Sequence, residues 1–359
     1  MSTFDAAYPS VHQGIVPGYL LAQLARSERY PHAAAAARQT LIAGRPAFHA
    51  ALELSIDENG DLVAEVTSAP TRTIFDAQNS ETLPGVIVRA EDDEPVADAA
   101  VNEAFDGLGA TFRLLLEAFE RDSLDGAGAP LNATVHYGED YDNAFWDGSR
   151  MVFGDGDGEV FVGFTRSVSV IGHELGHGVI QSTAGLVYRD QSGALNESIA
   201  DVLGALTEQH LLGQTADQAS WLIGAGIFAD AVQGRALRSM IEPGTAYDDD
   251  ELGRDPQPAH MDDYVQTVED NGGVHINSGI PNRAFALAAQ AIGGNTWERA
   301  GLAWYRALTS DLSSTAGFTE FAEKTITAAA EIGSTVESAV RDAWTAVGVI
   351  DGARDRERR

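Results

Sequence analysis

Residues 173–177 read His-Glu-Leu-Gly-His, and this segment constrains the chain more than any other feature. On a helix, His173 and His177 stand four residues apart, so they lie on one face with Cβ atoms about 5–6 Å apart. That spacing lets two imidazole rings bind one zinc ion, at about 2.0–2.1 Å from each nitrogen. Glu174 points off the ligand face but remains close enough to take a proton from water at the metal. The segment therefore predicts a zinc site with a general base beside it.

A zinc site of this kind needs a third protein ligand, and the segment 196–201, Asn-Glu-Ser-Ile-Ala-Asp, supplies a candidate. Glu197 follows His177 at a distance that leaves room for one helix to end, a turn to form and a second helix to begin. Asp201 lies one helical turn beyond Glu197 and is suited to accept the second ring N–H of a ligating histidine. The first motif alone also occurs in helices with buried core histidines. The second motif makes zinc binding the preferred interpretation.

Six segments resemble the thermolysin family of zinc metallopeptidases and occur in that family's order, namely 143–146, 154–158, 172–178, 192–197, 238–240 and 270–279. The resemblance runs from about residue 80 to about residue 350. Residues 244–249 and 255–258, with a short N-terminal extension, look most like the protealysin branch. The resemblance implies an α+β, two-domain fold, strand-rich in its N-terminal half and helical in its C-terminal half. The zinc helix would lie at the base of the cleft between the halves.

The resemblance also implies a role for each residue of the site. His173, His177 and Glu197 would bind zinc, and Glu174 would activate water. Hydrogen bonds to the oxyanion of the tetrahedral intermediate would come from His275 and Tyr188. The remaining roles are substrate binding by Asn143, Ala144 and Arg238, and support behind the ligands and His275 by Asn196, Asp201 and Asp270. Taken singly, Tyr188 and Arg238 are also ordinary packing residues, and only the motif context favours the functional reading.

Zinc aminopeptidases share the His-Glu-x-x-His segment and are the closest alternative class. They usually have one residue fewer before the third ligand, and they carry a Gly-Ala-Met-Glu-Asn segment that this chain lacks. An endopeptidase is therefore expected. Val170 and Leu237 match the family positions that line the pocket after the scissile bond, which implies a preference for a bulky apolar residue there. Both are equally ordinary core residues.

Calcium is the point at which the sequence departs from the larger thermolysin pattern. Ser169 stands where the family has a carboxylate, and residues 209–213 replace the acidic loop that follows Glu208. Glu208 alone cannot supply the six to eight oxygen ligands that calcium takes. The Gly-Asp-Gly-Asp-Gly segment at 154–158 is too short for an EF-hand, and a turn is preferred. We expect one zinc ion and a lost or weakened paired calcium site.

Cysteine is absent and the formal net charge is −31, and both facts limit what the chain can bind. The first excludes disulfides, thiolate zinc sites and a cysteine nucleophile. The second argues against nucleic acid or an anionic membrane as a partner. The expected partners are protein or peptide substrates, the chain's own N-terminal propeptide and a proteinaceous inhibitor. No basic residue precedes an apolar core near the N-terminus, so we expect a cytoplasmic protein or one secreted by a non-classical route.

We expect four parts, namely a propeptide-like extension at 1–60, a strand-rich part at 80–180 ending in the zinc helix, a helical part at 181–350, and a charged tail at 351–359. In the extension, Pro17 and Leu21 match a Pro-Pro-x-x-Leu element of protealysin-like precursors, although Gly18 replaces the second proline. An amphipathic helix docked on the surface is the alternative. Proteolytic removal of the extension is expected between residues 40 and 75.

Periodicity gives a coarse list of elements. Residues 80–165 are expected to form short antiparallel strands, with one helix from 96 to about 121. Helices are expected near 167–182, 195–212, 216–231, 278–293, 296–309, 316–332 and 335–346.

Three functions are compatible with these motifs. The first is a zinc endopeptidase made as a precursor and processed by itself. The second is a non-catalytic member of the fold that uses its cleft to bind peptides, and the third is a latent precursor that acts as a binding or inhibitory module. The chain carries every residue that the chemistry needs, and this favours the endopeptidase.

Overall fold

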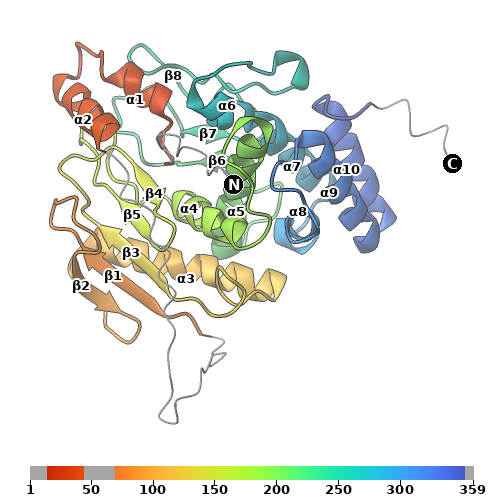
Figure 1. The fold of residues 1–359 in the computed structure, drawn as a ribbon, viewed down its shortest axis with the longest axis horizontal. Helices are drawn as coiled ribbons and strands as arrows, with labels where there is room; N and C mark the ends of the chain where they lie inside the picture. Colours follow the sequence, from red (N-terminus) through yellow and green to blue (C-terminus); the bar gives the residue numbers. More distant parts are fainter. Residues whose placement is uncertain (1–13, 44–68, 352–359) are drawn as a thin grey trace, which may run out of the picture.

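The structure is a computed structural model that describes residues 14–43 and 69–351 of the 359-residue chain. Most of the predicted cleavage region at 40–75 and nearly all of the predicted tail at 351–359 lie outside the described residues. A sheet with one long helix, a central pair of helices and a bundle of C-terminal helices follow one another across the molecule (Figure 1). The expected α+β fold, strand-rich in the first half and helical in the second, is confirmed.

A five-stranded sheet organises the first half of the molecule. Its strands are β1 (Arg72–Asp76), β2 (Val86–Ala90), β3 (Leu131–Val135), β4 (Ala144–Trp146) and β5 (Met151–Phe153), in the order β2-β1-β3-β5-β4. The expectation of antiparallel strands throughout is wrong, because β1 pairs with β3 and β3 with β5 in parallel. A parallel pair needs a long crossover connection, and the long helix of this half precedes β3 in the chain. Strand β4 forms one edge of the sheet, where its backbone can pair with an extended peptide.

That long helix is α3 (Ala99–Phe119), which packs against β1 and β3. It begins at Asp98, whose carboxylate accepts the Ala100 N–H at 2.9 Å and so caps the first turn. Its buried apolar positions recur every three or four residues, at Val101, Ala104, Phe105, Leu108, Phe112 and Leu115. Burial of this stripe holds the helix on the sheet, within the predicted range of 96–121.

Glycines allow the two central helices, α4 (Val168–Gln181) and α5 (Asp190–Leu212), to approach each other closely. A Cβ atom on Gly176 would lie 2.9 Å from the Cα atom of Ala200, and one on Gly204 would lie 2.3 Å from the Ser169 carbonyl oxygen. Side chains at these positions would therefore push the helices apart. Helix α5 also begins earlier than the predicted residue 195. The two metal-ligand motifs lie on this pair, one on each helix.

The second half is mainly helical, with α6 (Asp270–Asn277), α7 (Gly279–Ile292), α8 (Ala300–Leu308), α9 (Phe318–Ile332) and α10 (Ser334–Ala346). Its core includes Trp304 and Trp344, whose stacked rings have centroids 5.8 Å apart. The helices predicted at 278–293, 316–332 and 335–346 are confirmed, whereas the range 296–309 divides into a 3-10 turn, Thr296–Glu298, and α8.

The helix predicted at 216–231 is wrong. This region forms loops and the short strand β6 (Leu222–Ile223), which pairs with β7 (Arg238–Ser239). Gly224 and Gly226 take the left-handed conformation, with φ of 75° and 83°, and this interrupts any helical run. A second short pair consists of β8 (Asp248–Asp249) and β9 (Gly253–Arg254).

Two N-terminal helices, α1 (Gly18–Leu24) and α2 (Pro31–Ile42), lie beside the β4–β5 end of the sheet (Figure 1). The Thr40 hydroxyl oxygen accepts the Asp142 N–H at 3.0 Å, and the Glu159 carboxylate accepts the Ala33 N–H at 3.1 Å. Leucines of α1 are buried in the main core, namely Leu20, Leu21 and Leu24. The extension is therefore packed on the rest of the chain through both apolar and polar contacts.

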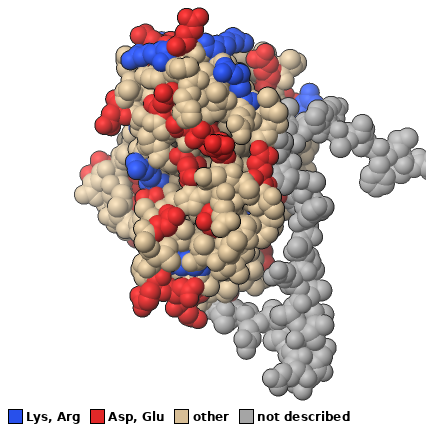
Figure 2. Space-filling view, turned by 90° about the vertical axis from the view of Figure 1, so that its left-hand side faces the viewer, with Lys and Arg blue, Asp and Glu red and all other residues tan. Residues whose placement is uncertain are grey.

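Acidic side chains outnumber basic ones over the face drawn in Figure 2 and are spread across it. This distribution agrees with the net charge of −31 and with a solvated acidic surface. Within residues 14–43 and 69–351, none of the helices combines the length and the apolar character that a membrane span requires.

Candidate active site

His173 and His177 on α4 and Glu197 on α5 form a compact cluster, as their spacing predicts. Their potential ligand atoms all lie within 4.8 Å of one another. The two Nε2 atoms are 3.1 Å apart, and the Glu197 carboxylate oxygens lie 3.5 Å from His173 Nε2 and 3.6 Å from His177 Nε2. Among the described residues, this is the one group of three such side chains close enough to hold a metal ion.

The hydrogen bonds of the two rings show that the cluster suits a cation. His173 Nδ1 donates to Asp201 at 2.7 Å, and His177 Nδ1 donates to Asn196 Oδ1 at 2.8 Å. In the neutral rings both Nε2 atoms then carry lone pairs, and these point toward each other and toward a carboxylate. One carboxylate oxygen of Glu197 is buried without a hydrogen-bond partner. Two imidazole nitrogens and a carboxylate with free lone pairs are the donor set of a catalytic zinc site.

Asp201 supports the cluster from behind. Its side chain is fully buried, and its two oxygens also accept hydrogen bonds from Arg238 at 2.8 and 2.9 Å and from Asn282 at 2.8 Å. Burial raises the pKa of Asp201, but the charges of Arg238 and His173 outweigh this effect and hold the pKa well below its usual range. The carboxylate is therefore charged, and it orients the ring of His173.

His275 and Tyr188 converge on the same side of Glu197. The Tyr188 hydroxyl donates to the Glu197 carboxylate and lies 3.2 Å from His275 Nε2. The second Glu197 oxygen is 3.5 Å from His275 Nε2. The two predicted oxyanion donors thus lie beside each other and beside the predicted metal ligand Glu197.

Asp270 holds His275 in place by two hydrogen bonds. One carboxylate oxygen accepts the His275 backbone N–H at 2.8 Å, and the other accepts Nδ1–H at 2.6 Å. The chain can fold back in this way because Asn271, Gly272 and Gly273 all have positive φ. Burial lowers the pKa of His275, but the carboxylates of Glu197 and Asp270 outweigh it and raise the pKa to about 9. The raised pKa favours the protonated ring, in which Nε2–H is a hydrogen-bond donor.

Glu174 is fully buried next to the ligand cluster. One of its carboxylate oxygens accepts the backbone N–H of Trp146, on the edge strand β4, at 2.8 Å. This bond links the predicted general base to the strand that would hold a substrate. Trp146 has no predicted role in the sequence, because its contribution is a backbone N–H, which any residue other than proline can supply.

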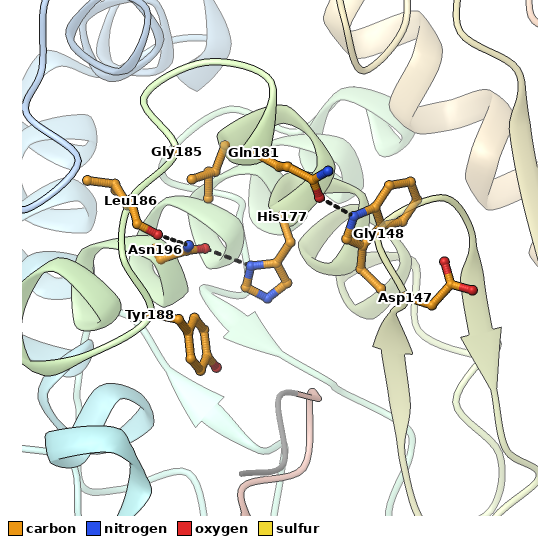
Figure 3. A pocket seen from close by; sticks show the side chains of 10 residues that line it. Asp147, Gly148, His177, Gln181, Gly185, Leu186, Tyr188 and Asn196 are labelled. Atoms are coloured by element: carbon orange, nitrogen blue, oxygen red, sulfur yellow. Dashed lines mark hydrogen bonds between the residues drawn. The ribbon is translucent and has the colours of Figure 1, made fainter. Parts of the chain in front are cut away.

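A pocket of about 290 Å³ opens beside His177 and is lined by Trp146, Ile180, Gln181, Leu186, Tyr188 and Asn196, among others. In Figure 3, His177 points into this space, and Asn196 joins the His177 ring to the backbone of Leu186. Gln181 accepts the indole N–H of Trp146 at 3.1 Å. His177 is the most exposed of the three predicted ligands, at 15% of its side chain, so the ion would be reached from this side.

Asn143, Ala144 and Arg238 all bind one short segment of the same chain, residues 15 and 16. Ile15 N–H donates to the Ala144 carbonyl at 3.0 Å, and Arg238 donates to the Ile15 carbonyl at 3.1 Å. The Asn143 amide accepts the Val16 N–H at 2.9 Å and donates to the Val16 carbonyl at 3.1 Å. The three residues predicted to bind substrate therefore bind a peptide backbone in this structure, and that backbone is the chain's own N-terminal segment.

The region expected to have lost the paired calcium site carries hydroxyl contacts. Ser169 Oγ accepts the Gly224 N–H at 3.1 Å, and the Ser220 hydroxyl donates to Glu208 at 3.3 Å. Burial raises the pKa of Glu208, which disfavours the charged form that calcium needs. The loss of this site stays a prediction.

Two further residues of the site escaped sequence analysis. Asn282, which bonds to Asp201, lies just beyond the 270–279 motif, and its pairing with a residue on another helix leaves no local pattern. Gln257 donates to the His275 carbonyl at 2.8 Å and lies within the recognised segment 255–258, where it was given no role. Buried amides beside a functional motif are the signal that could have indicated both.

Fold and site together have the features of a zinc peptidase, namely a group of two histidines and a glutamate that can hold one ion and an edge strand beside it. Residues 52–181 match the catalytic domain of thermolysin metallopeptidases, and residues 184–349 match the α-helical domain of the same enzymes. An extracellular metalloprotease of Pectobacterium carotovorum is 55% identical over 280 residues, covering 77% of this chain and 81% of that protein. The precursor of protealysin from Serratia proteamaculans matches with a TM-score of 0.86 and 48% identity, over 94% of this chain and all of that one (100%).

The chain belongs to the thermolysin family of zinc metallopeptidases, and within it to the protealysin-like branch. It is a zinc endopeptidase with a propeptide. The expectation of a cytoplasmic protein is contradicted by the names of its relatives. Besides the Pectobacterium protein, an extracellular minor metalloprotease of Serratia marcescens is 49% identical over 195 residues, covering 54% of this chain and 55% of that protein.

Proposed function

We propose that the chain is a latent zinc endopeptidase in which Glu174 is the general base. The observation that carries this proposal is the burial of Glu174 beside the His173, His177 and Glu197 cluster, with one oxygen held by the Trp146 N–H at 2.8 Å. His173, His177 and Glu197 would hold a zinc ion, which when bound would supply Lewis-acid polarisation of the peptide carbonyl and a lower pKa of its water. Glu174 then takes the proton of the attacking water and later passes it to the leaving amine.

His275 and Tyr188 stabilise the oxyanion that develops on the substrate carbonyl. Glu197 and Asp270 raise the pKa of His275 to about 9 despite its burial, and this favours the charged ring as a donor. Tyr188 adds a hydroxyl donor 3.2 Å from the His275 ring nitrogen. Donors that are already aimed at the developing charge are worth a few kcal/mol each, about 2.7–4 kcal/mol for a single donor in a serine protease.

An extended substrate would pair with β4 through Asn143 and Ala144, and Arg238 would bind the carbonyl of the residue after the scissile bond. Support comes from Ile15 and Val16, which make these contacts and are completely buried. A bulky apolar residue is preferred after the scissile bond, since Val170 and Leu237 would line its pocket and both are buried apolar side chains.

The same contacts would keep the precursor latent, because a substrate cannot pair with β4 while residues 15 and 16 occupy it. A proteinaceous inhibitor would have to compete for this edge in the same way. We infer that the mature enzyme acts outside the cell, as the names of its relatives indicate for those proteins.

The decisive experiment compares casein hydrolysis by the purified precursor, by the processed protein and by a processed Glu174→Gln variant. Activity should appear on processing, disappear with a chelator, return with zinc and be about 10²–10⁴-fold lower in the variant. Zinc content, measured by metal analysis, should be equal in wild type and variant. Chelator-insensitive hydrolysis, or hydrolysis by the variant at the wild-type rate, would refute the proposed chemistry.

A further inference from the structure

Residues 14–16 lie beside β4 and are held there by hydrogen bonds of their backbone. The Ile15 N–H donates to the Ala144 carbonyl at 3.0 Å, and the side-chain amide of Asn143 accepts the Val16 N–H at 2.9 Å and donates to the Val16 carbonyl at 3.1 Å. Both side chains are completely buried. Strand addition of this kind is how sheet edges bind extended peptides, with main-chain bonds for affinity and pockets for alternate side chains.

The order of these contacts gives the direction of the segment. Val16 is held at Asn143 and Ile15 at Ala144, so the chain that passes from Val16 to Ile15 advances along β4 in the direction of Trp146. The Trp146 N–H is the group that holds the Glu174 carboxylate, at 2.8 Å. The carbonyl of Ile15, which follows the Gly14–Ile15 bond in the chain, accepts a hydrogen bond from Arg238 at 3.1 Å. The bond from Gly14 to Ile15 therefore lies on the Glu174 side of the residue that Arg238 holds.

The fit at Gly14 is close. A Cβ atom at this position would lie 2.7 Å from the Ala144 carbonyl oxygen and 2.8 Å from the Asn143 amide. A residue with a side chain would have to move away from the strand to avoid these atoms. Glycine at position 14 thus keeps the Gly14–Ile15 bond in contact with the edge of the cleft.

We infer that the Gly14–Ile15 bond is itself a substrate of this active site, so that the chain cuts its own N-terminal segment there. This inference rests on the proposed function. Water adds its oxygen to the Gly14 carbonyl carbon while Glu174 takes a proton. The C–N bond to Ile15 breaks and the proton passes to the Ile15 nitrogen. The products are a chain ending in the Gly14 carboxylate and a chain beginning with the Ile15 amine.

Cleavage at this bond does not release the rest of the extension. Helix α2 keeps its hydrogen bonds to Asp142 and Glu159, at 3.0 and 3.1 Å, and α1 keeps its buried leucines. Ile15 and Val16 also keep their bonds to β4. The nicked chain is therefore held like a product, and full activity needs a second cleavage beyond α2.

The test uses the full chain, purified without zinc in the presence of a chelator. Zinc is then added, and intact mass and N-terminal sequence are followed with time. A chain beginning at Ile15 should form before casein hydrolysis appears, at a rate that does not change over a hundredfold dilution, because the bond lies in its own cleft. Glu174→Gln should give no such chain. Activation without any chain that begins at Ile15 would overturn the inference.

A pair of variants checks that the position of Ile15 selects the bond. Ile15→Asp puts a charge into a buried apolar site and should abolish cleavage after Gly14. Ile87→Asp makes the same change on β2 at a side chain that is 60% exposed, and should leave the rate of cleavage after Gly14 unchanged. A fluorescence-quenched peptide with leucine after its scissile bond measures endopeptidase activity on a separate substrate. It therefore distinguishes the inference about the Gly14–Ile15 bond from the proposed function. Hydrolysis of that peptide without an Ile15 terminus refutes the inference alone, and failure of both reactions refutes the proposed function too.

Discussion

Replacing Asp201 by Asn tests the network that supports the metal ligands. The carboxylate accepts hydrogen bonds from His173 at 2.7 Å, from Arg238 at 2.8 and 2.9 Å, and from Asn282 at 2.8 Å. Asn keeps the shape of the side chain, but it removes the charge and converts one oxygen into an NH2 group. Whichever way this amide turns, it points a donor at a donor, and Arg238 is left as an uncompensated buried cation.

Two magnitudes follow from this geometry. Loss of one partner of a buried ion pair costs about 3–5 kcal/mol of unfolding free energy. Loss of the acceptor behind a ligating histidine weakens metal binding by about 10–100-fold. The pKa of Asp201 lies below its usual range, because Arg238 and His173 outweigh the effect of burial. Its contribution is therefore present above the ordinary aspartate pKa and lost as the pH falls, so wild type and variant should approach each other in acid.

Urea unfolding of the zinc-free proteins would measure the first magnitude, and competition for zinc with a chromogenic chelator would measure the second. Asp311→Asn is the matched control, since it makes the same chemical change at an ion pair with Lys324 on the surface, where the Asp311 side chain is 91% exposed. This control should leave both the unfolding midpoint and zinc affinity unchanged. If Asp201→Asn behaved like the control in both assays, the supporting role assigned to Asp201 would be wrong.

Three other changes test separate parts of the structure. Glu174→Gln should lower peptide hydrolysis by about 10²–10⁴-fold, the usual contribution of a general base, without loss of zinc; a change in metal content would instead indicate a ligand role. Gly204→Ala should cost about 1–3 kcal/mol in urea unfolding by forcing α4 and α5 apart, and unchanged stability would contradict the tight contact. Hydrogen bonding to Asp155, with help from Asp98, outweighs burial and raises the pKa of His136 to about 9 from 6.5. The stability lost in His136→Gln should therefore be full below pH 6.5 and disappear as the pH rises through about 9; a loss independent of pH would refute this assignment.

The metal site was predictable because the spacing of two of its ligands along one helix largely determines its geometry. The separation of His173 and His177 fixes them on one face of a helix, whatever the rest of the chain does. The position of Glu197 relative to the two histidines does not follow from local spacing, since it depends on how α5 packs along α4. Gly176 and Gly204 allow that approach. The sequence does not show which element a helical glycine packs against, so this contact could not be predicted.

The errors in the fold arose where non-local pairing overrode local pattern. Alternating apolar residues predict strands but not their direction, so the parallel pairs of β3 with β1 and β5 were missed. Residues 216–231 are apolar at helical spacing, yet Gly224 and Gly226 turn the chain, and Ile223 pairs with Arg238 instead. This pairing fixes the backbone of Arg238, whose side chain reaches Asp201 in the site. The segment that departs from the helical pattern therefore helps to position a site residue.

The N-terminal segment illustrates a different limit. Pro17 and Leu21 marked the extension in the sequence, but the residues that enter the cleft are Ile15 and Val16, whose importance comes from their backbone. Backbone contacts carry no residue signature, so only the folded chain reveals them. The same holds for the Trp146 N–H that binds Glu174.

One buried carboxylate joins the two halves of the proposed reaction. Asp201 contacts the metal ligand His173 and, through its second set of bonds, the guanidinium of Arg238, which binds the Ile15 carbonyl at 3.1 Å. A displacement of Asp201 would therefore change the position of both His173 and Arg238. Since coupling between two bound groups is reciprocal, zinc should raise the affinity of the site for the N-terminal segment by the same factor as the segment raises the affinity for zinc. The N-terminal segment would then be bound most firmly when the site is ready to cut it.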